Sequence, residues 1–321
     1  MAGKRPSIGK ELVRGTARDV RMFARGWRWG RRPLVPRSAE PHTPAPGRRE
    51  FPTRWARSPA GIALREVVQK VGLNPLFRFE VEPHVTGLDV LDGLRMPVIF
   101  VANHSSHLDT PMLLCTLPDA WRRRTAMAAA ADYFFDTWWR AAGSAIAFNT
   151  FPIERRGGQL ATTPGSVLEE GWNVVVFPEG TRSPDGWTGR FRLGAAYLAV
   201  EHRVPVVPIA LRGSYAAMPR GRGWPVPGRP PVRVRYGRPL FPGEGEGPRD
   251  FGKRISSAVA QLLDEDRTTW WRAMRNAAEG TTPSPSGPDV APWRRIWAQT
   301  AAPEVERSRR VWAKKRRIPL P

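Results

Sequence analysis

The sequence predicts an α/β fold, and three observations support this prediction. Short apolar runs at residues 98–102 and 174–177 lack polar alternation, which is typical of strands buried on both faces. Segments with apolar residues at helical spacing, such as residues 251–263, occur along the same chain. Both apolar runs end in polar turns, and ligands bind at the carboxyl ends of strands in open α/β sheets. These turns are therefore where we look for a functional site.

Helices are expected where apolar residues recur at helical spacing or follow a polar turn. In chain order they are residues 59–73, a helix after the turn at 103–109, residues 134–142, a helix ending within 165–171, residues 191–200, and a helix from 251 to about 275. Trp138 and Trp139 belong to the third of these helices. Their expected role is core packing, or contact with acyl chains or a bilayer.

Strands are expected where apolar residues alternate with polar ones or form short runs. In chain order they are residues 77–85, 98–102, 125–131, 146–153, 174–177, 204–211 and 232–236. Pro205 and Pro208 interrupt the run at 204–211. Because proline cannot donate to a sheet ladder, this strand is expected at a sheet edge or with a bulge.

The composition is strongly basic, with 51 Lys and Arg against 29 Asp and Glu and a net charge of +22 over 321 residues. This charge favours a polyanionic partner: a membrane surface, a nucleic acid or a phosphorylated substrate. Cys115 is the only cysteine, which excludes an internal disulfide and indicates a reducing compartment. We interpret it as a core residue. We expect neither a secretory signal nor a transmembrane helix, which needs roughly 18 apolar residues in a row.

Three regions are expected from the distribution of charge and proline. They are a basic N-terminal arm with Pro and Trp (residues 1–57), a central domain (58–275), and a linker with a basic C-terminal tail (276–321). Within the arm, residues 7–32 fit either a basic amphipathic helix at an anionic bilayer or a disordered segment. Residues 33–52 are rich in proline and are interpreted as a linker.

The first polar turn runs from Asn103 to Asp109 and precedes a predicted helix with Asp109 or Thr110 as its N-cap. A neutral His104 can take a proton from an alcohol near pH 7. Asp109 can accept the other ring N–H of that histidine and stabilise the imidazolium as it forms. The alternative is that Asp109 only caps the helix and the histidines of the turn are surface residues.

A second polar turn follows the predicted strand at 146–153. It contains Arg155 and Arg156, followed by two glycines. Arginine can hold a phosphate with two hydrogen bonds, and glycines allow backbone amides to approach an anion closely. A solvated turn is the common alternative for two adjacent arginines.

The third polar turn follows residues 174–177 and reads Pro178-Glu179-Gly180-Thr181-Arg182-Ser183. Gly180 permits a positive φ angle. Thr181 and Arg182 offer hydrogen-bond donors to an anion, and Glu179 can accept a hydrogen bond from a substrate hydroxyl or orient an arginine.

Together these turns resemble the sequence blocks of the PlsC-type glycerophospholipid acyltransferases, the family of 1-acyl-sn-glycerol-3-phosphate acyltransferases. Residues 103–109 (Asn-His-Ser-Ser-His-Leu-Asp) match its His-x4-Asp block, and residues 151–155 (Phe-Pro-Ile-Glu-Arg) look like the second block. Residues 177–183 (Phe-Pro-Glu-Gly-Thr-Arg-Ser) look like the third block, and the proline-bearing residues 204–211 look like the fourth. The blocks occur in the family's order, and the resemblance spans about residues 77–240.

The resemblance implies a mixed β-sheet wrapped by helices, like that of glycerol-3-phosphate acyltransferases, with an N-terminal helical element that docks on the membrane. Residues 59–73 and part of the arm would supply that element. The implied reaction transfers a fatty acyl group from acyl-CoA or acyl-carrier protein to the free hydroxyl of lysophosphatidic acid, giving phosphatidic acid. No metal or other cofactor is expected. The expected location is the cytoplasmic face of the cell membrane, as a peripheral or monotopic protein on an anionic surface.

The resemblance also implies roles for single residues. His104 would act as the general base and Asp109 would orient it, so that the alcohol attacks the thioester directly. Residues that hold the acceptor phosphate or shape its pocket are expected to be Arg155, Arg156, Glu179, Gly180, Thr181 and Arg182. Either Arg155 or Arg156 can fill the phosphate-contacting place of the second block.

Three other interpretations are considered. The acceptor could be a different lysophospholipid or a glycolipid. A non-catalytic basic protein that binds membranes or nucleic acid would explain the charge, but it leaves the polar turns at strand ends without a role, and no nucleic acid is expected. A metallohydrolase could use His104, His107 and Asp109 as ligands, but it leaves the third block without a role.

Overall fold

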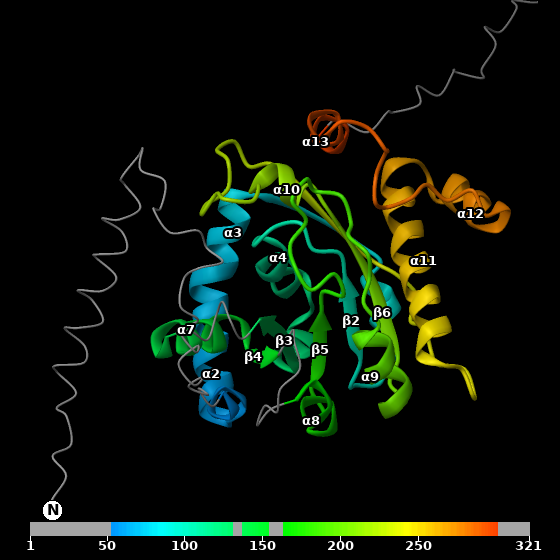
Figure 1. Cartoon of the computed structure of the whole chain (residues 1–321). Helices are drawn as coiled ribbons and strands as arrows, with labels where there is room; N and C mark the ends of the chain where they lie inside the picture. Colours follow the sequence, from blue (N-terminus) through cyan, green and yellow to red (C-terminus); the bar gives the residue numbers. More distant parts are fainter. Residues whose placement is uncertain (1–52, 131–136, 154–162, 301–321) are drawn as a thin grey trace, which may run out of the picture. The chain divides into compact units, whose positions relative to one another are not determined.

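The computed structural model describes residues 53–130, 137–153 and 163–300 (Figure 1). The chain divides into two compact units, residues 1–48 and 49–321, and every described residue belongs to the second. The predicted arm helix at 7–32, the linker at 33–52, Arg155, Arg156 and the tail from residue 301 onward all lie outside the described residues.

A single mixed sheet of seven strands forms the centre of the part of the chain that the structure describes. Its strands are β1 (Glu82–Thr86), β2 (Ile99–Ala102), β3 (Thr125–Ala130), β4 (Thr150–Ile153), β5 (Asn173–Val176), β6 (Val206–Arg212) and β7 (Pro231–Tyr236). Their order in the sheet is β1-β7-β6-β2-β5-β3-β4. Neighbouring strands are parallel except for β6 and β7, which are antiparallel. The predicted mixed α/β sheet is therefore confirmed.

Helices surround this sheet (Figure 1). They are η1 (Arg54–Arg57), α2 (Pro59–Val67), the π-helical η2 (Val68–Leu73), α3 (Asn74–Glu80), η3 (Leu88–Leu91), α4 (Asp109–Thr116), α5 (Asp119–Arg123), α7 (Trp138–Phe148), α8 (Pro164–Glu169), α9 (Gly194–His202), α10 (Ser214–Ala217), α11 (Pro248–Arg267), α12 (Trp270–Glu279) and α13 (Pro292–Thr300). No helix of the described residues combines the length and the apolar character that a membrane span requires.

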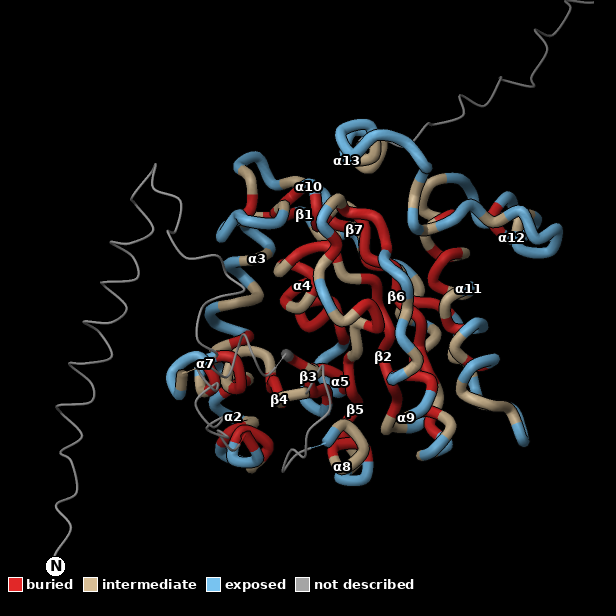
Figure 2. The backbone as a smooth tube through the Cα atoms, viewed as in Figure 1, coloured by how far each residue is buried: buried red, intermediate tan, exposed pale blue. Residues whose placement is uncertain are grey.

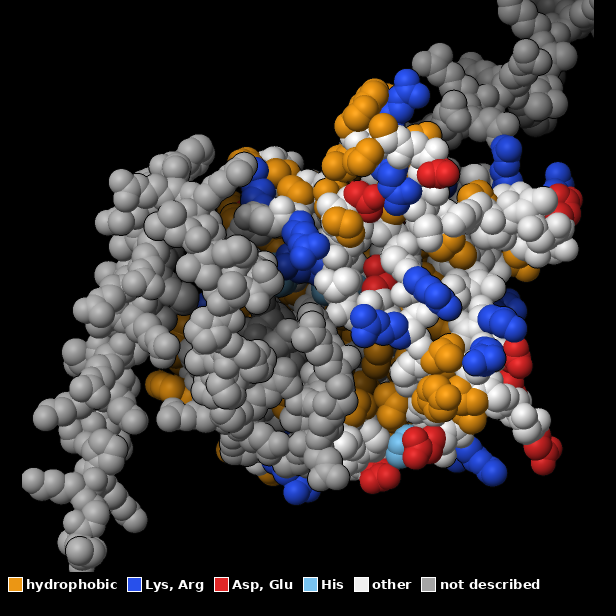
Figure 3. Space-filling view, in the orientation of Figure 1, with side chains coloured by type: hydrophobic (Ala, Val, Ile, Leu, Met, Phe, Trp, Pro, Cys, Tyr) orange, Lys and Arg blue, Asp and Glu red, His pale blue; other side chains and the backbone are white. Residues whose placement is uncertain are grey.

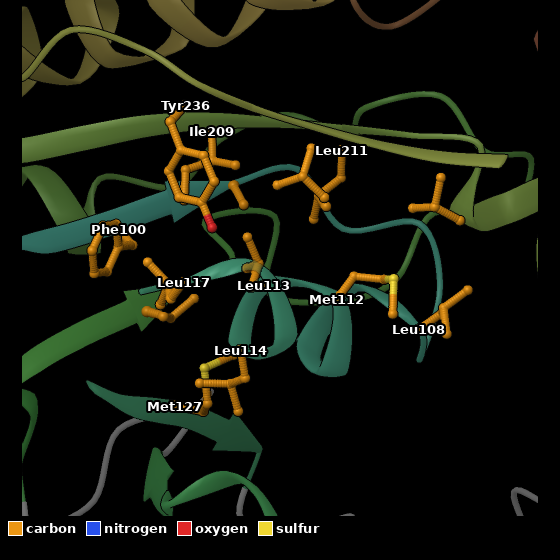
Figure 4. Close-up of a cluster of buried hydrophobic side chains, with 14 of the residues drawn as sticks. Phe100, Leu108, Met112, Leu113, Leu114, Leu117, Met127, Ile209, Leu211 and Tyr236 are labelled. Carbon is orange, nitrogen blue, oxygen red and sulfur yellow. The ribbon is translucent and has the colours of Figure 1, made fainter. Parts of the chain in front are cut away.

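The core has two layers, one on each face of the sheet, and Figure 2 shows the buried strands between them. Along β2 the side chains alternate, so that Phe100 packs in one layer while Ile99 and Val101 pack in the other. The first layer is closed by α4, whose Met112 and Leu113 are buried against the sheet (Figure 4). The second layer is closed by α8, α9 and α11. All of β2 is buried, which confirms the predicted strand with two covered faces.

Two predicted strands are shorter than expected because helices occupy part of their sequence. Residues 77–80 end α3, so the strand expected at 77–85 begins only at Glu82. Apolar residues at 77 and 81 are spaced as a helix turn also requires, so alternation alone misleads here. The strand expected at 146–153 begins at Thr150 because α7 continues to Phe148. The C-cap residue of that helix, Asn149, has a left-handed φ of 51°.

The strand at 204–211 was expected at an edge or with a bulge, and the edge position was wrong. Strand β6 lies inside the sheet, with β2 on one side and β7 on the other, and all of it is buried. The β6–β7 ladder begins at the pair Ile209–Tyr236, so Pro208 lies just outside it. The carbonyl of Pro208 accepts the N–H of Gly237. An antiparallel bridge pairs Val206 with Leu240, three residues before Ile209 and four after Tyr236, so the pairing is irregular next to the proline.

The C-terminal part of the described chain is more structured than expected. The helix predicted to continue to about residue 275 breaks after Arg267, and α12 begins with Thr269 as its N-cap. That threonine accepts the N–H of Arg272, which satisfies a free amide of the new helix. The predicted linker from residue 276 contains the end of α12 and the helix α13. The helix expected at 134–142 corresponds to α7, which begins at Trp138 and continues to Phe148, and residues 134–136 lie outside the described residues. The other predicted elements agree with the structure to within a few residues.

Candidate active site

The histidine turn between β2 and α4 joins His104 to Asp109. Nδ1 of His104 lies 2.9 Å from Oδ2 of Asp109. The same carboxylate oxygen accepts the backbone N–H groups of Ser105 (2.7 Å) and Ser106 (2.8 Å). An ionised carboxylate only accepts hydrogen bonds, so Nδ1 carries the proton and Nε2 of the neutral ring is left as the basic nitrogen. Asp109 is fully buried, while the side chain of His104 stays 17% exposed.

The residues around the pair fix the shape of this turn. Asn103 directly follows β2, and its side-chain amide donates to the carbonyl of Leu211 (2.9 Å) and accepts the N–H of the same residue (2.8 Å). The turn is thereby attached to β6. Helix α4 begins at Asp109, with Leu108 in the N-cap position, so the N-cap predicted at Asp109 or Thr110 was wrong. The carboxylate of Asp109 instead reaches back to the turn, where it binds the amides and the imidazole.

The third polar turn lies directly against the histidine turn. The ring of Phe177 is stacked on that of His104, with centroids 4.1 Å apart and an interplanar angle of 17°. The main chain of His104 is held on both sides: its N–H donates to Oε1 of Glu179 (2.7 Å), and its carbonyl accepts the N–H of Ser183 (2.9 Å). Two turns more than 70 residues apart in sequence therefore meet at one histidine.

Glu179 serves as a buried acceptor within this pair of turns. Its second oxygen, Oε2, accepts the N–H of Gly189 at 2.8 Å. Burial raises the pKa of Glu179 to about 7, although the N–H groups of His104 and Gly189 act in the opposite direction. Both carboxylate oxygens thus bind main-chain amides of this chain. The expected contact of Glu179 with a substrate hydroxyl remains a prediction.

The third turn also brings Gly180, Thr181 and Arg182 to the region of His104 and His107. Gly180 has a φ of 72°, which confirms the predicted positive φ, and Thr181 is exposed. Burial lowers the pKa of His107 to about 4, with the charge of Arg182 as the next cause and that of His104 after it. His107 is therefore neutral near pH 7, and Arg182 is close enough for its charge to act on it.

Some site residues were not found from the sequence. Phe177 was recognised as part of a block but not as a ring stacked on His104. Arg192 was missed: a Cβ added to Gly180 would lie 3.2 Å from its guanidinium carbon, so this cation packs on the third turn. An arginine shortly after the block is a weak signal in so basic a chain. Arg155 and Arg156 lie outside the described residues.

A small cavity lies behind the histidine turn. Its lining includes Asn103, Trp187, Arg212, Arg267 and Gln299, but among the described residues it includes neither His104 nor Asp109. Groups of three or more His, Cys, Asp and Glu side chains arranged to hold a metal ion do not occur in the described ranges.

Comparison with known proteins agrees with the resemblance of the sequence blocks. Residues 82–212 match the family model described as Acyltransferase. The 1-acyl-sn-glycerol-3-phosphate acyltransferase of Pseudomonas aeruginosa is 39% identical over 112 residues, which cover 33% of this chain and 41% of that protein. The mouse 1-acyl-sn-glycerol-3-phosphate acyltransferase alpha is 34% identical over 175 residues, covering 52% of this chain and 58% of that protein.

A solved structure also matches. It is the 1-acyl-sn-glycerophosphate (LPA) acyltransferase PlsC from Thermotoga maritima, with a TM-score of 0.52 and 25% sequence identity, covering 69% of this chain and 85% of that one. The chain spans about half the length of the curated relatives that it matches, with 41% and 58% as two examples. The fold and the paired turns thus agree with the match of residues 82–212 to the acyltransferase family.

Proposed function

We propose that the protein transfers a fatty acyl group from acyl-CoA or acyl-carrier protein to the free hydroxyl of lysophosphatidic acid, giving phosphatidic acid. The observation that carries this proposal is the His104–Asp109 pair, held at 2.9 Å and covered by the third block of the same domain. The relatives that match are named 1-acyl-sn-glycerol-3-phosphate acyltransferases, which supports the choice of acceptor.

In this mechanism His104 is the general base. Its Nε2 takes the proton of the acceptor hydroxyl while the oxygen attacks the thioester carbonyl carbon, a contribution of about 10²–10⁴-fold in rate. The new C–O bond forms, the C–S bond breaks, and the proton passes from the imidazolium to the leaving thiolate. Asp109 holds the ring in the tautomer with a free Nε2 and stabilises the imidazolium. No acyl-enzyme and no metal is needed.

The acceptor phosphate requires cations near this histidine. Arg182 fits that role because it lies on the third turn and its charge acts on His107. Arginine is suited to phosphate because its planar guanidinium can donate two parallel hydrogen bonds. Arg155 and Arg156 remain predicted phosphate ligands. Thr181 is exposed on the same turn and can add a hydroxyl donor.

A membrane-docking role is proposed for the helices that precede the sheet. Leu64, Val67, Val71, Leu76 and Phe79 are exposed along α2, η2 and α3. Apolar side chains in such a row favour the interface of a bilayer, and the net charge of +22 favours an anionic one. The cytoplasmic face of the cell membrane remains the proposed location, as the resemblance of the sequence blocks implies.

The helix α13 offers a further apolar surface. Trp293, Ile296 and Trp297 are exposed on it, and Figure 3 shows hydrophobic side chains gathered there beside Lys and Arg side chains. Exposed tryptophan side chains are suited to the headgroup region of a membrane.

The decisive experiment is an assay of the purified protein with labelled acyl-CoA or acyl-carrier protein and a panel of lysolipids, analysed by mass spectrometry. The proposal expects acylation of lysophosphatidic acid and its loss in His104→Ala, with vesicle binding retained. Acylation of another lysophospholipid or of a glycolipid instead would show that this other lipid, and not lysophosphatidic acid, is the acceptor. If His104→Ala keeps wild-type turnover, the catalytic assignment is wrong, and if chelators abolish turnover, the metal-dependent alternative gains support.

A further inference from the structure

Trp187 joins the third turn to a segment near the C-terminus of the described chain. We call residues 283–299 the C-terminal strap. The indole Nε1–H of Trp187 donates to the carbonyl of Arg295 at 2.8 Å. Its ring lies between Arg267, whose guanidinium carbon is 4.4 Å from the ring centroid, and Gly287, where an added Cβ would lie 2.2 Å from the indole. The strap therefore fits closely around one buried tryptophan.

The main chain on both sides of Trp187 is also bound to the strap. Thr188 donates its N–H to the carbonyl of Pro285 at 3.0 Å. The side-chain amide of Gln299 donates to the carbonyl of Gly186 at 2.8 Å. Consecutive residues of the loop are thus held by hydrogen bonds to residues about 100 positions further along the chain.

Arg295 forms hydrogen bonds both within the strap and with the loop that contains Trp187. Its Nε donates to Oδ2 of Asp185 at 2.7 Å. Its Nη1 and Nη2 donate to the carbonyls of Pro288 and Ser286, each at 2.8 Å. These hydrogen bonds fix the curvature of the strap and hold it to the carboxylate of Asp185. A guanidinium group is suited to this because it can donate several hydrogen bonds at once.

Two hydrogen-bond paths lead from this loop to the main chain of His104. In the first, Oδ1 of Asp185 accepts the hydroxyl of Ser183 (3.1 Å), and Ser183 donates its N–H to the His104 carbonyl (2.9 Å). In the second, Gly189, next to the strap-bound Thr188, donates to Glu179 (2.8 Å), which accepts the His104 N–H (2.7 Å). Both sides of the His104 main chain therefore depend on a loop that the strap holds.

We propose that Arg295 and Trp187 are positioning residues, through which the C-terminal strap holds the 179–189 loop and with it the orientation of His104. This inference rests on the proposed acyl transfer for its kinetic consequence. The strap lies outside residues 82–212, the part that the family model matches. It is a separate segment of this chain that holds the 179–189 loop of that domain through hydrogen bonds.

The test compares Arg295→Ala with Arg294→Ala in the full chain. Arg294 is its neighbour on α13, is exposed and stacks on Trp293, so its replacement removes a charge without touching the loop. In Arg295→Ala we expect kcat to fall about tenfold, with the KM of both substrates changed by less than about twofold, because a displaced base loses transition-state stabilisation and not ground-state binding. Arg294→Ala should keep the wild-type kcat.

Two conservative variants separate positioning from folding. Arg295→Lys keeps the charge opposite Asp185 and is expected to recover part of the lost kcat. Trp187→Phe keeps the ring between Arg267 and Gly287 and removes only the N–H donor, so its kcat should fall less than that of Arg295→Ala. All variants are assayed below their melting transitions. Equal kcat for Arg295→Ala and wild type would overturn the proposal.

A second readout does not depend on activity. Hydrogen–deuterium exchange should be faster in Arg295→Ala for peptides covering residues 100–110 and 177–190, and unchanged in Arg294→Ala. Unchanged exchange in both peptides would overturn the positioning role, whatever the activity. If the wild-type protein acylates no lysolipid but Arg295→Ala still exchanges faster, the strap holds the loop and the proposed function is wrong. The exchange experiment therefore tests the positioning role independently of the proposed acyl transfer.

Discussion

The imidazole of His104 is stacked on the phenyl ring of Phe177, with 4.1 Å between their centroids. This contact fixes the plane of the imidazole, while Asp109 fixes which nitrogen carries the proton. The orientation of His104 therefore depends on residues from two separate blocks of the sequence, and the proposed proton transfer requires both contacts to direct Nε2 at an alcohol.

Replacing Phe177 by leucine should lower kcat about three- to tenfold, because a stacked aromatic pair contributes about 0.5–1.5 kcal/mol beyond its apolar burial. Leucine keeps the apolar volume, so the melting temperature should change little. The control is Phe241→Leu, because Phe241 is exposed elsewhere on the surface. Steady-state kinetics with lysophosphatidic acid measure the effect, and equal kcat values for the two variants would show that the stack has no part in turnover.

Asp109→Asn should lower kcat by about 10²–10⁴-fold, because an amide can present an N–H to Nδ1 and favour the wrong imidazole tautomer. The KM values should change much less, since the carboxylate is buried behind the ring. Asp92→Asn is the matched control, because Asp92 is exposed. The assay needs a circular-dichroism spectrum to show that both variants are folded. A kcat within a few-fold of wild type would refute the role of Asp109.

The raised pKa of Glu179, at about 7, predicts a pH dependence of stability. The folded protein favours the neutral carboxyl group, so its stabilising contribution is complete below the ordinary pKa of 4.5 and is lost as the pH rises through about 7. Glu179→Gln cannot ionise and should lack this dependence. Melting temperatures measured from pH 4.5 to 8 should show wild type losing stability relative to Glu179→Gln as the pH rises. If the melting temperatures of the two proteins change in parallel with pH, the raised pKa of Glu179 is contradicted.

Arg182→Ala should raise the KM for lysophosphatidic acid by about 10–100-fold, the equivalent of about 1.5–3 kcal/mol for a hydrogen bond to a charged group. The KM for the acyl donor should stay unchanged. Monoacylglycerol, which lacks the phosphate, serves as the second acceptor, and any activity on it should be insensitive to the substitution. Arg249→Ala, at the exposed start of α11, controls for the loss of a positive charge. If both acceptors respond equally, Arg182 does not recognise the phosphate.

The exposed apolar row on α2, η2 and α3 predicts membrane binding. Val71 and Phe79 are 76% and 73% exposed, so replacing both by aspartate should leave the fold intact. Binding to vesicles that contain phosphatidylglycerol should weaken by about tenfold or more, since burying one Phe or Val contributes about 1.5–3 kcal/mol. Co-sedimentation measures the partition. Tyr197→Asp on α9, another exposed residue, should bind as wild type does, and equal losses in both proteins would exclude a specific docking face.

The parts of the fold that were predicted correctly depend on local signals. The runs at 98–102 and 174–177 are apolar without interruption because β2 and β5 are covered on both faces, so the pattern reports burial directly. The His104–Asp109 pair was also predictable, because both residues belong to one short turn. Its hydrogen-bond distance follows from the geometry of that turn.

The parts that were missed depend on distant residues. The place of Pro208 inside the sheet depends on where the β6–β7 ladder begins, and that is set by pairing with Tyr236. The strap is a stronger case: nothing near Trp187 in the sequence indicates that Arg295 and Gln299 will bind its loop. A segment rich in Thr, Pro and Ser looks like a linker whether or not it packs, because such residues form turns in either case.

The position of β2 between β5 and β6 has a consequence for how the protein is made. The strand and its histidine turn are synthesised early, yet both neighbours come from residues 173–212, so a nascent chain that has emerged only to residue 150 presents an unpaired hydrophobic strand. The contacts that the 177–183 turn makes with His104 can form only in the later half of translation.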